Sequence, residues 1–388
     1  MRLEKLRAIG LMSGTSLDGV DAAWIETDGV TVFGTGPSLT LSYGDTLRND
    51  LRRLLDRAPE LTGLDSFTLN VTRRLTDRHA EAIAALQRDA DIIGFHGQTI
   101  LHQPQAQRTW QIGDAAALAL RSGMPVAWDF RSTDVASGGE GAPLAPIYHA
   151  ARAAGIVGPV AVLNLGGVGN VTAIGADGSL LAFDTGPGNG PLDDWAARYT
   201  NDTIDRDGIL SAAGRVNETV LARLMSDSYF TRLPPKSLDR LDFARSLAAS
   251  GLSNLSPADG AATLVAFTAA SVAAAKLQDP PLRWLVTGGG RHNPTIMAAL
   301  SQRLRVPVHP VDADGWDGDA LEAECFALLA VRVRHGLPLS FPGTTAVPCP
   351  MPGGRIALPW PNFSGQQPSS VRSPSPPPVA PIESPPPP

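Results

Sequence analysis

A chain of 388 residues, of which 43% are hydrophobic and 18% charged, is long enough for two or three domains that each bury a core. Its 32 basic and 38 acidic residues give a formal charge of −6 without any basic run, which argues against a protein that grips nucleic acid by its phosphates. Two cysteines, Cys325 and Cys349, cannot form a disulfide framework and are typical of a reducing cytoplasm.

The sequence predicts neither a signal peptide nor a membrane span. The charged residues 1–7 lead straight into a short apolar strand, without an apolar signal region and cleavage site. The longest apolar stretch covers residues 261–276 and is interrupted by hydroxyl side chains, so it is too short to cross a bilayer. We therefore expect a cytoplasmic protein with a buried helix over this stretch.

Short apolar strands alternate with longer helical patterns along the chain. The first half predicts strands over residues 6–12, 22–27, 30–43, 91–95 and 126–128, with helices over 47–57, 68–88 and 114–121. The second half predicts strands over residues 160–165, 170–174, 180–184 and 284–287, with helices among them. Because strand-rich runs followed by helices occur twice, we expect two α/β lobes with a cleft between them.

Residues 364–388 consist almost entirely of proline, serine and a few other small or polar residues. Proline removes backbone donors and fixes φ, and this segment has no apolar pattern to bury. We expect it to be disordered or polyproline II. Its PxxP-like runs could dock in an SH3-type groove, although an inert tail is the simpler interpretation.

The first glycine-rich turn lies between two apolar strands and reads GLMSGTSLDGVD over residues 10–21. Glycines let a backbone come close to a ligand, hydroxyl groups suit phosphate oxygens, and Asp18 and Asp21 could hold Mg²⁺ through water. The turn lacks the lysine of a P-loop. We predict a phosphate-binding turn, rather than an ordinary hairpin, formed by Gly14, Thr15, Ser16, Leu17, Asp18, Gly19, Val20 and Asp21.

A second turn, FDTGPGN over residues 183–189, follows a strand and precedes a helix that begins near Pro191. Asp184 stands at the strand end beside glycines that expose backbone amides, which would place an acid–base group next to a bound phosphate. We predict that Gly186, Gly188 and Asn189 contact this phosphate. The alternative is a plain strand-to-helix turn in which Asp184 acts as a cap.

A third turn, TGGGRHNP over residues 287–294, follows another strand. Three glycines without side chains leave a backbone surface on which a flat ring can lie, so Gly288, Gly289 and Gly290 are candidate nucleotide contacts. A merely flexible loop is the alternative.

Three further polar patches contain His96, Arg131 and Glu322. Taken singly, His96 would be structural, Arg131 would form a surface ion pair, and Glu322 would favour the dipole of the helix that it begins. The sequence contains no histidine or cysteine cluster with zinc spacing and no GxSxG elbow.

Together, the three glycine turns resemble those of the actin/hexokinase/Hsp70-type ATPase superfamily. Within it, the chain resembles the anhydro-N-acetylmuramic acid kinase family over roughly residues 8–360. The runs that carry this resemblance, in the family's order, are GLMSGTSLDGVD, GFHGQTILHQP, TWQIGD, DFRSTDVASGGEGAPLAP, FDTGPGNGPLDDW, PPKS, TGGGRHNP and GWDGDALEAECFALLA. The chain departs from the usual pattern at Phe95, at residues 238–241, at Glu324 and in its proline-rich tail.

The resemblance implies a two-lobed actin-like fold of duplicated ribonuclease H-like domains. The first lobe would take residues 1–130, with 341–362 returning to it, and the second would take 131–340. It further implies ATP and Mg²⁺ as cofactors, Asp18 at the metal, no nucleic-acid or membrane partner, and allows a homodimer.

The implied reaction is the ATP-dependent conversion of 1,6-anhydro-N-acetylmuramic acid to N-acetylmuramic acid 6-phosphate in peptidoglycan recycling. Asp184 would be the general base, and His96, Arg131 and Glu322 would contact the sugar, with the arginine at the lactyl carboxylate. Two alternatives remain open: a kinase or phosphohydrolase of the same fold that acts on another sugar, and a non-catalytic nucleotide-dependent interaction protein that docks through its tail.

Overall fold

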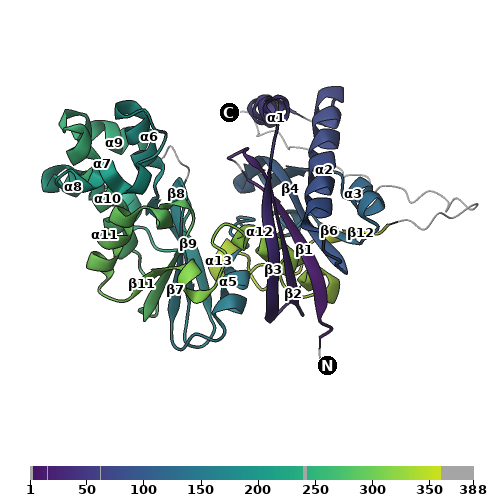
Figure 1. The fold of residues 1–388 in the computed structure, drawn as a ribbon. Helices are drawn as coiled ribbons and strands as arrows, with labels where there is room; N and C mark the ends of the chain where they lie inside the picture. Colours follow the sequence, from purple (N-terminus) through teal and green to yellow (C-terminus); the bar gives the residue numbers. More distant parts are fainter. Residues whose placement is uncertain (1–2, 15, 62, 239–242, 360–388) are drawn as a thin grey trace, which may run out of the picture.

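The computed structural model describes residues 3–14, 16–61, 63–238 and 243–359. The predicted proline-rich tail lies outside these residues. Two β-sheets with their helices form two halves that lie side by side (Figure 1). In the described part of the chain, the helices are too short or too polar to cross a membrane.

The first sheet is built mainly from the first third of the chain. Its strands are β1 (Leu6–Ser13), β2 (Gly19–Thr27), β3 (Val32–Ser42), β4 (Ile92–Gln103), β5 (Arg108–Ile112), β6 (Val126–Trp128) and β12 (Arg355–Ala357). The pairs β1–β2 and β2–β3 are antiparallel, whereas β4 joins β1 and β6 joins β4 in parallel. Strands β5 and β12 attach antiparallel to β4 and β6.

The second sheet repeats this arrangement. Its strands are β7 (Val160–Leu165), β8 (Val168–Ile174), β9 (Leu180–Pro187), β10 (Arg283–Thr287) and β11 (Val308–Pro310). The pairs β7–β8 and β8–β9 are antiparallel, whereas β10 joins β7 and β11 joins β10 in parallel. The order β9-β8-β7-β10-β11 therefore matches β3-β2-β1-β4-β6, which confirms the predicted duplicated α/β fold.

Helices cover both sheets and end close to where their patterns predicted. They are α1 (Asp45–Arg57), α2 (Ser66–Leu86), α3 (Ala115–Ser122), α4 (Ser132–Ala136), α5 (Pro146–Ala153), α6 (Gly190–Tyr199), α7 (Ile209–Ala212), α8 (Glu218–Met225), α9 (Ala244–Ala249), α10 (Pro257–Ala273), α11 (Pro294–Leu304), α12 (Leu321–His335) and α13 (Pro342–Thr345). Helices α1, α2 and α3 pack on the first sheet, and α8, α10 and α11 on the second.

Helix α10 is the buried helix predicted from the apolar stretch. Every residue over 260–272 is buried, on all sides of the helix. Its small side chains allow this close packing: a Cβ on Gly260 would lie only 2.1 Å from the Trp195 ring. Ser256 caps the helix through its hydroxyl group, and Pro257 occupies the first turn, where no backbone donor is lost.

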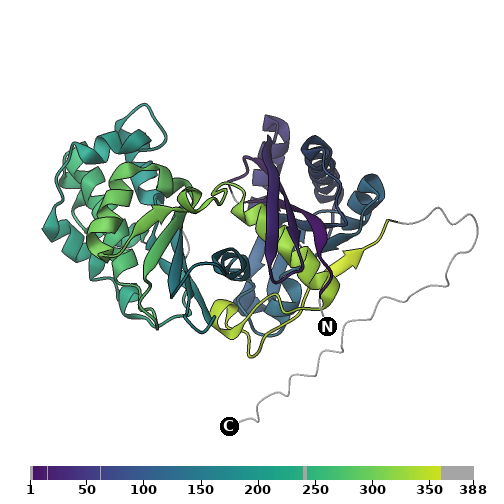
Figure 2. The ribbon, with the colours of Figure 1, turned by 60° about the horizontal axis from the view of Figure 1, so that its bottom comes forward.

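Helix α12 joins the two halves. It packs against β1, β2 and β4, and it shares one hydrophobic cluster with Val160, Val162 and Leu285 of the second sheet. In Figure 2 this yellow-green helix lies against the purple strands of the first sheet. Because residues of both sheets share this cluster with α12, the lobe boundaries near residues 130 and 340 stay a prediction.

A buried polar cluster fastens α12 to α5. Glu324, which the family pattern does not predict, accepts a hydrogen bond from the Tyr148 hydroxyl and pairs with Arg152 at 3.3 Å. Arg152 also donates to the Gly315 carbonyl at 3.2 Å. The unusual glutamate therefore has both its charge and its hydrogen bonds satisfied, as a buried carboxylate requires.

Candidate functional site

The first glycine turn joins β1 to β2. The amide of Leu17, a residue with a φ of +54°, donates to the Gly14 carbonyl at 3.3 Å. The Ser16 hydroxyl donates to the Asp18 carboxylate at 2.7 Å. A Cβ on Gly14 would find nothing closer than 3.9 Å, whereas one on Gly19 would lie 2.6 Å from a backbone oxygen of β3. Gly14 therefore faces open space, while Gly19 is needed for strand packing.

Gly14→Ala is expected to raise the KM for ATP about tenfold or more, because a Cβ would hold the phosphates away from the turn. The free energy of unfolding should change by less than about 0.5 kcal/mol, since the site has room for a methyl group. Gly44→Ala is the matched control, because a Cβ there also meets nothing within 4 Å. Normal ATP kinetics in Gly14→Ala, measured beside a thermal melt, would show that the turn is only structural.

A turn that the sequence reasoning missed occupies the equivalent place in the second sheet. Gly166 and Gly167 join β7 to β8, just as the first turn joins β1 to β2. The Asn189 amide donates to the Gly166 carbonyl at 2.8 Å, and the Gly188 amide donates to the Gly167 carbonyl at 3.1 Å. Two glycines between two strands, repeating the first-half pattern, are the signal that could have revealed this turn.

The third glycine turn packs against the end of β7, directly before the turn at Gly166 and Gly167. A Cβ on Gly288, whose φ is +76°, would lie 2.6 Å from the Leu165 carbonyl oxygen, and one on Gly290 would lie 2.7 Å from the Leu165 side chain. Gly289 is exposed, and the nearest atom to a Cβ there is Asn189 Nδ2 at 3.8 Å. The structure thus brings the turns at 166–167, 186–189 and 288–290 together at one edge of the second sheet.

Gly186 differs from its neighbours in this cluster. A Cβ on it would lie 2.6 Å from the Ser271 side chain and 3.2 Å from the Phe230 ring. Its φ of +156° is also unfavourable for other residues. Gly186 therefore has a packing reason to be glycine, whereas Gly188 meets the backbone of the neighbouring turn.

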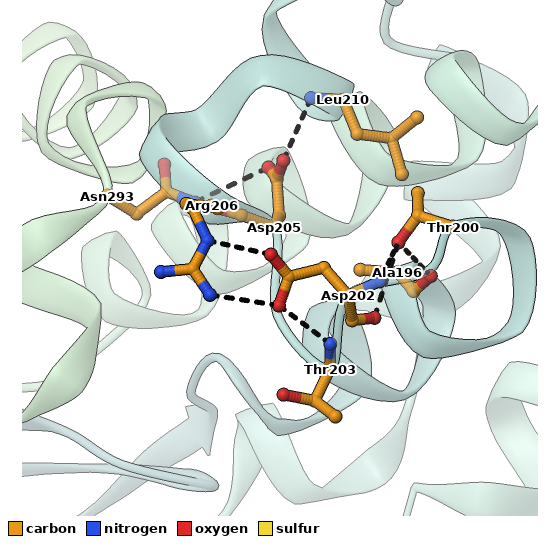
Figure 3. Close-up of polar contacts among 8 residues, drawn as sticks. All are labelled: Ala196, Thr200, Asp202, Thr203, Asp205, Arg206, Leu210 and Asn293. Atoms are coloured by element: carbon orange, nitrogen blue, oxygen red, sulfur yellow. Dashed lines mark hydrogen bonds and ion pairs between the residues drawn. The ribbon is translucent and has the colours of Figure 1, made fainter.

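A hydrogen-bonded network supports the third turn from behind. Asn293 caps α11 by accepting from the amides of Thr295 and Ile296, and its Nδ2 donates to the Asp205 carbonyl at 3.2 Å. Figure 3 shows Asp205 reaching the Leu210 amide, a bond of 2.8 Å. The segment after the three glycines is therefore held rigidly rather than being the flexible loop of the alternative interpretation.

The segment before α12 connects the third turn with the first sheet. Arg291, whose side chain is buried, pairs with Asp312 and Asp319, each at 2.9 Å. The Ser38 hydroxyl on β3 donates to Asp317 at 2.6 Å. These contacts place acidic residues near Asp21, whose pKa is raised first by burial and further by the neighbouring negative charges.

Asp184 lies near the end of β9, partly buried. Its Oδ1 accepts from Asn170 Nδ2 at 2.9 Å, and its Oδ2 accepts from the Leu238 amide at 2.7 Å. Burial raises the pKa of this carboxyl, and both donors oppose the rise because they stabilise the charged form. A carboxylate with a raised pKa and free lone pairs suits a general base.

A cavity of about 560 Å³ contains Asp184. Residues from both halves line it, and the polar or charged ones are His102, Gln105, Glu140, Asp184, Arg232, Lys236, Ser237 and Thr344. A space of this size fits a small ligand such as a monosaccharide.

His96 and Arg131 form a hydrogen-bonded pair next to Gly141, which lies between two residues that line this cavity. Arg131 Nε donates to His96 Nε2 at 3.1 Å, and its Nη1 donates to the Gly141 carbonyl at 2.7 Å. Burial first, and then the positive charge of Arg131, hold the pKa of His96 well below its usual value, so this histidine is neutral. His96 thus stands behind Arg131 and orients it.

Glu322 lies in the first turn of α12, and its side chain reaches solvent. The surrounding protein atoms remove part of the water around its carboxyl and so raise its pKa, and the positive charge of Arg131 opposes this rise. Glu322 and Arg131 are therefore close enough to interact electrostatically, as a shared substrate site would need. Within the described residues, no group of three or more acidic, histidine or cysteine side chains gathers to hold a metal ion.

The repeated topology and the clustered glycine turns define a two-lobed α/β protein of the ATPase type. The family model of anhydro-N-acetylmuramic acid kinase matches residues 6–356. The chain therefore belongs to the anhydro-N-acetylmuramic acid kinase family.

Two relatives of the same family name agree with this assignment over 99% of their length. Anhydro-N-acetylmuramic acid kinase of Acidiphilium cryptum (strain JF-5) is 61% identical, over 92% of this chain and 99% of the relative. The enzyme of the same name from Gluconobacter oxydans (strain 621H) is 54% identical, over 90% of this chain and 99% of the relative. A solved structure, the inorganic polyphosphate/ATP-glucomannokinase of Arthrobacter sp. strain KM, is 16% identical over 85% of this chain and 99% of that chain, with a TM-score of 0.39.

Proposed function

We propose that this enzyme uses ATP and water to convert 1,6-anhydro-N-acetylmuramic acid to N-acetylmuramic acid 6-phosphate and ADP, as a step of peptidoglycan recycling. The family assignment supports the substrate, and the cavity around Asp184 supports the chemistry. The single observation that carries the mechanism is the Asp184 carboxylate, which is oriented by two donors and faces a cavity of sugar size.

In the proposed reaction, Asp184 takes a proton from a water molecule whose oxygen attacks the anomeric carbon C1. The C1–O6 bond breaks, and O6 takes the γ-phosphoryl group as the bond between that group and ADP breaks. A glycosidase would need a second carboxylic acid to protonate the leaving oxygen. Here the phosphoryl group captures it, so one carboxylate at C1 is sufficient.

Backbone amides of the glycine turns would bind the phosphates of ATP. We assign this role to the predicted residues of the first turn, 14–21, and to Gly188, Asn189 and the turn at 288–290, with 166–167 as an addition. Gly186 remains a predicted neighbour of this site, although its surroundings explain it by packing. His96, through Arg131, and Glu322 would hold the sugar.

The residues around the first turn fit Mg²⁺, which prefers oxygen ligands. Asp18 and Asp21 supply carboxylates, and the buried Gln98 donates from Nε2 to the Gly14 carbonyl at 3.2 Å while its Oε1 has no partner in the described structure. An unpaired buried carbonyl oxygen is suited to a hydrated cation. When bound, Mg²⁺ would neutralise charge on the phosphoryl oxygens.

We place the enzyme in the cytoplasm, where ATP is available and where free thiols such as buried Cys325 and exposed Cys349 are typical. A homodimer stays a prediction that light scattering of the purified protein would check.

The proposed function predicts strict coupling between the sugar and ATP. ADP release, followed with a coupled assay, is expected only when 1,6-anhydro-N-acetylmuramic acid is present, and the product should be the 6-phosphate. ATP hydrolysis without sugar would instead favour a phosphohydrolase. Tight ATP binding without turnover on any anhydro-sugar would favour an interaction protein.

A further inference from the structure

Asp184 is held at four points by three separate segments: β8, the short helix Ser228–Thr231, and the loop with Lys236 and Leu238. Besides the two bonds to its carboxylate, its backbone amide donates to the Lys236 carbonyl at 3.0 Å. Its carbonyl accepts from the Tyr229 hydroxyl at 2.5 Å. The loop that contains Lys236 and Leu238 therefore fixes the backbone and one carboxylate oxygen, and β8 fixes the other oxygen through Asn170.

The Asn170 side chain has one suitable orientation. Asn170 lies directly opposite Asp184 in the antiparallel pairing of β8 and β9, so both side chains project from the same face of the sheet. Its amide must present the NH₂ group to the carboxylate, because its carbonyl oxygen would repel a second acceptor. A β-bulge between Gly169 and Asn170 shifts the register at this point.

Within the described residues, two hydrogen-bond donors rather than a counter-ion stabilise the charge on Asp184. Among the described residues, no lysine or arginine makes an ion pair with it. The other titratable side chains that line the cavity are His102, Glu140, Arg232 and Lys236. In the part of the chain that the structure describes, the carboxylate accepts hydrogen bonds from Asn170 and from the Leu238 amide, and both oppose the rise in pKa that burial causes.

We propose that Asn170 is the positioning residue of the general base, which holds one oxygen of Asp184 so that a remaining lone pair faces the attacking water. A carboxylate offers about four lone-pair positions, and two donors occupy two of them. The inference rests on the proposed function, because it assigns a role to Asn170 within that reaction.

One of the two donors to Asp184 is a backbone amide and the other is a side chain, so a substitution can remove only the second. Leu238 bonds Asp184 through its backbone amide, so the departure of its side chain from the family pattern leaves this bond in place. Asn170 bonds through its side chain and is the one that substitution can remove. It is therefore the sharper test of how Asp184 is held.

Two variants and one control test the proposal. Asn170→Leu keeps the approximate shape but removes the donor, and Asn170→Asp places a second carboxylate against Asp184. Thr172→Val is the control, because it removes a buried hydrogen bond of 2.9 Å to His149 from the same strand without touching Asp184. For each protein, sugar-dependent ADP release is measured across a range of pH, and the KM for ATP is determined. A thermal melt gives the melting temperature of each protein.

Asn170→Leu is expected to lower kcat about 10–100-fold, as for loss of a hydrogen bond to a charged group, with KM for ATP unchanged. The acid limb of kcat/KM should move to higher pH, since the charged form of Asp184 loses a donor. Asn170→Asp should move it further, because two adjacent carboxylates resist joint ionisation. Thr172→Val should melt earlier but keep its acid limb in place.

An acid limb that stays in place in both Asn170 variants, with melting lowered as in the control, would overturn the proposal. If the wild-type protein shows no sugar-dependent ADP release, the proposed function fails. In that case a carbon-13 NMR titration of the Asp184 carboxyl still decides the role of Asn170. An Asp184 pKa that is the same in Asn170→Leu as in the wild type would then refute it.

Discussion

Asp184→Asn is expected to lower turnover by about 10²–10⁴-fold, the usual effect of losing a general base. An amide cannot accept the proton of the attacking water. It also has one acceptor oxygen where the carboxylate has two, so the variant must give up its bond from either Asn170 or the Leu238 amide. A modest loss of stability, about 1 kcal/mol, should accompany the loss of activity.

Both halves of the reaction should fail together in this variant, because ring opening and phosphorylation share one transition state. Binding of ATP and of the anhydro-sugar, measured by calorimetry, should survive, since neither needs proton transfer. A variant that phosphorylates at a near-normal rate, or opens the ring without ATP, would exclude Asp184 as the base. The search would then turn to Glu322 or Asp18.

Gly10→Ala is expected to lower the free energy of unfolding by about 3 kcal/mol or more, as overpacking against a backbone does. A Cβ on Gly10 would lie 1.8 Å from the Ala323 carbonyl oxygen and 2.5 Å from the Ala327 amide nitrogen. Neither atom can turn away, because both belong to the backbone of α12. The helix must therefore shift from the first sheet, which also disturbs its packing on α5 and in the cluster that it shares with residues of the second sheet.

Gly34→Ala is the matched control, since it lies in β3 and a Cβ there meets nothing within 4 Å. Gly94→Ala should behave like Gly10→Ala, because its Cβ would lie 1.9 Å from the Phe326 carbonyl oxygen. Chemical denaturation compares the three variants. Equal stability of Gly10→Ala and Gly34→Ala would mean that α12 tolerates displacement from the first sheet.

The sequence alone determined most of the elements and the repeated α/β plan. Apolar runs, helical periodicity and turn residues are local signals, and they predicted strands β1, β7 and β10 within one or two residues of their ends. Three short strands, β5, β11 and β12, were missed. Each is only three to five residues long, so it carries little local pattern. Strands β11 and β12 pair with strands distant in the chain, whereas β5 forms a hairpin with the preceding strand β4.

The candidate site was predicted at the level of segments, because glycine turns and acidic residues after strands are visible in one dimension. The tertiary structure decided what each residue contacts. Gly14 faces open space, whereas Gly10 and Gly186 face a helix. His96 stands behind Arg131, and Asn170 meets Asp184 across a strand pair.

The physical reason is the same in each case. The backbone preferences of a glycine or an asparagine depend on its neighbours in the chain. The atoms that contact it in these cases belong to other segments. Only the packing of the two sheets on α12, and of the loop at 234–238 on β9, brings those segments together. The sequence by itself thus determined which segments carry the chemistry, and the tertiary structure decided which residues contact the ligand and which hold the fold.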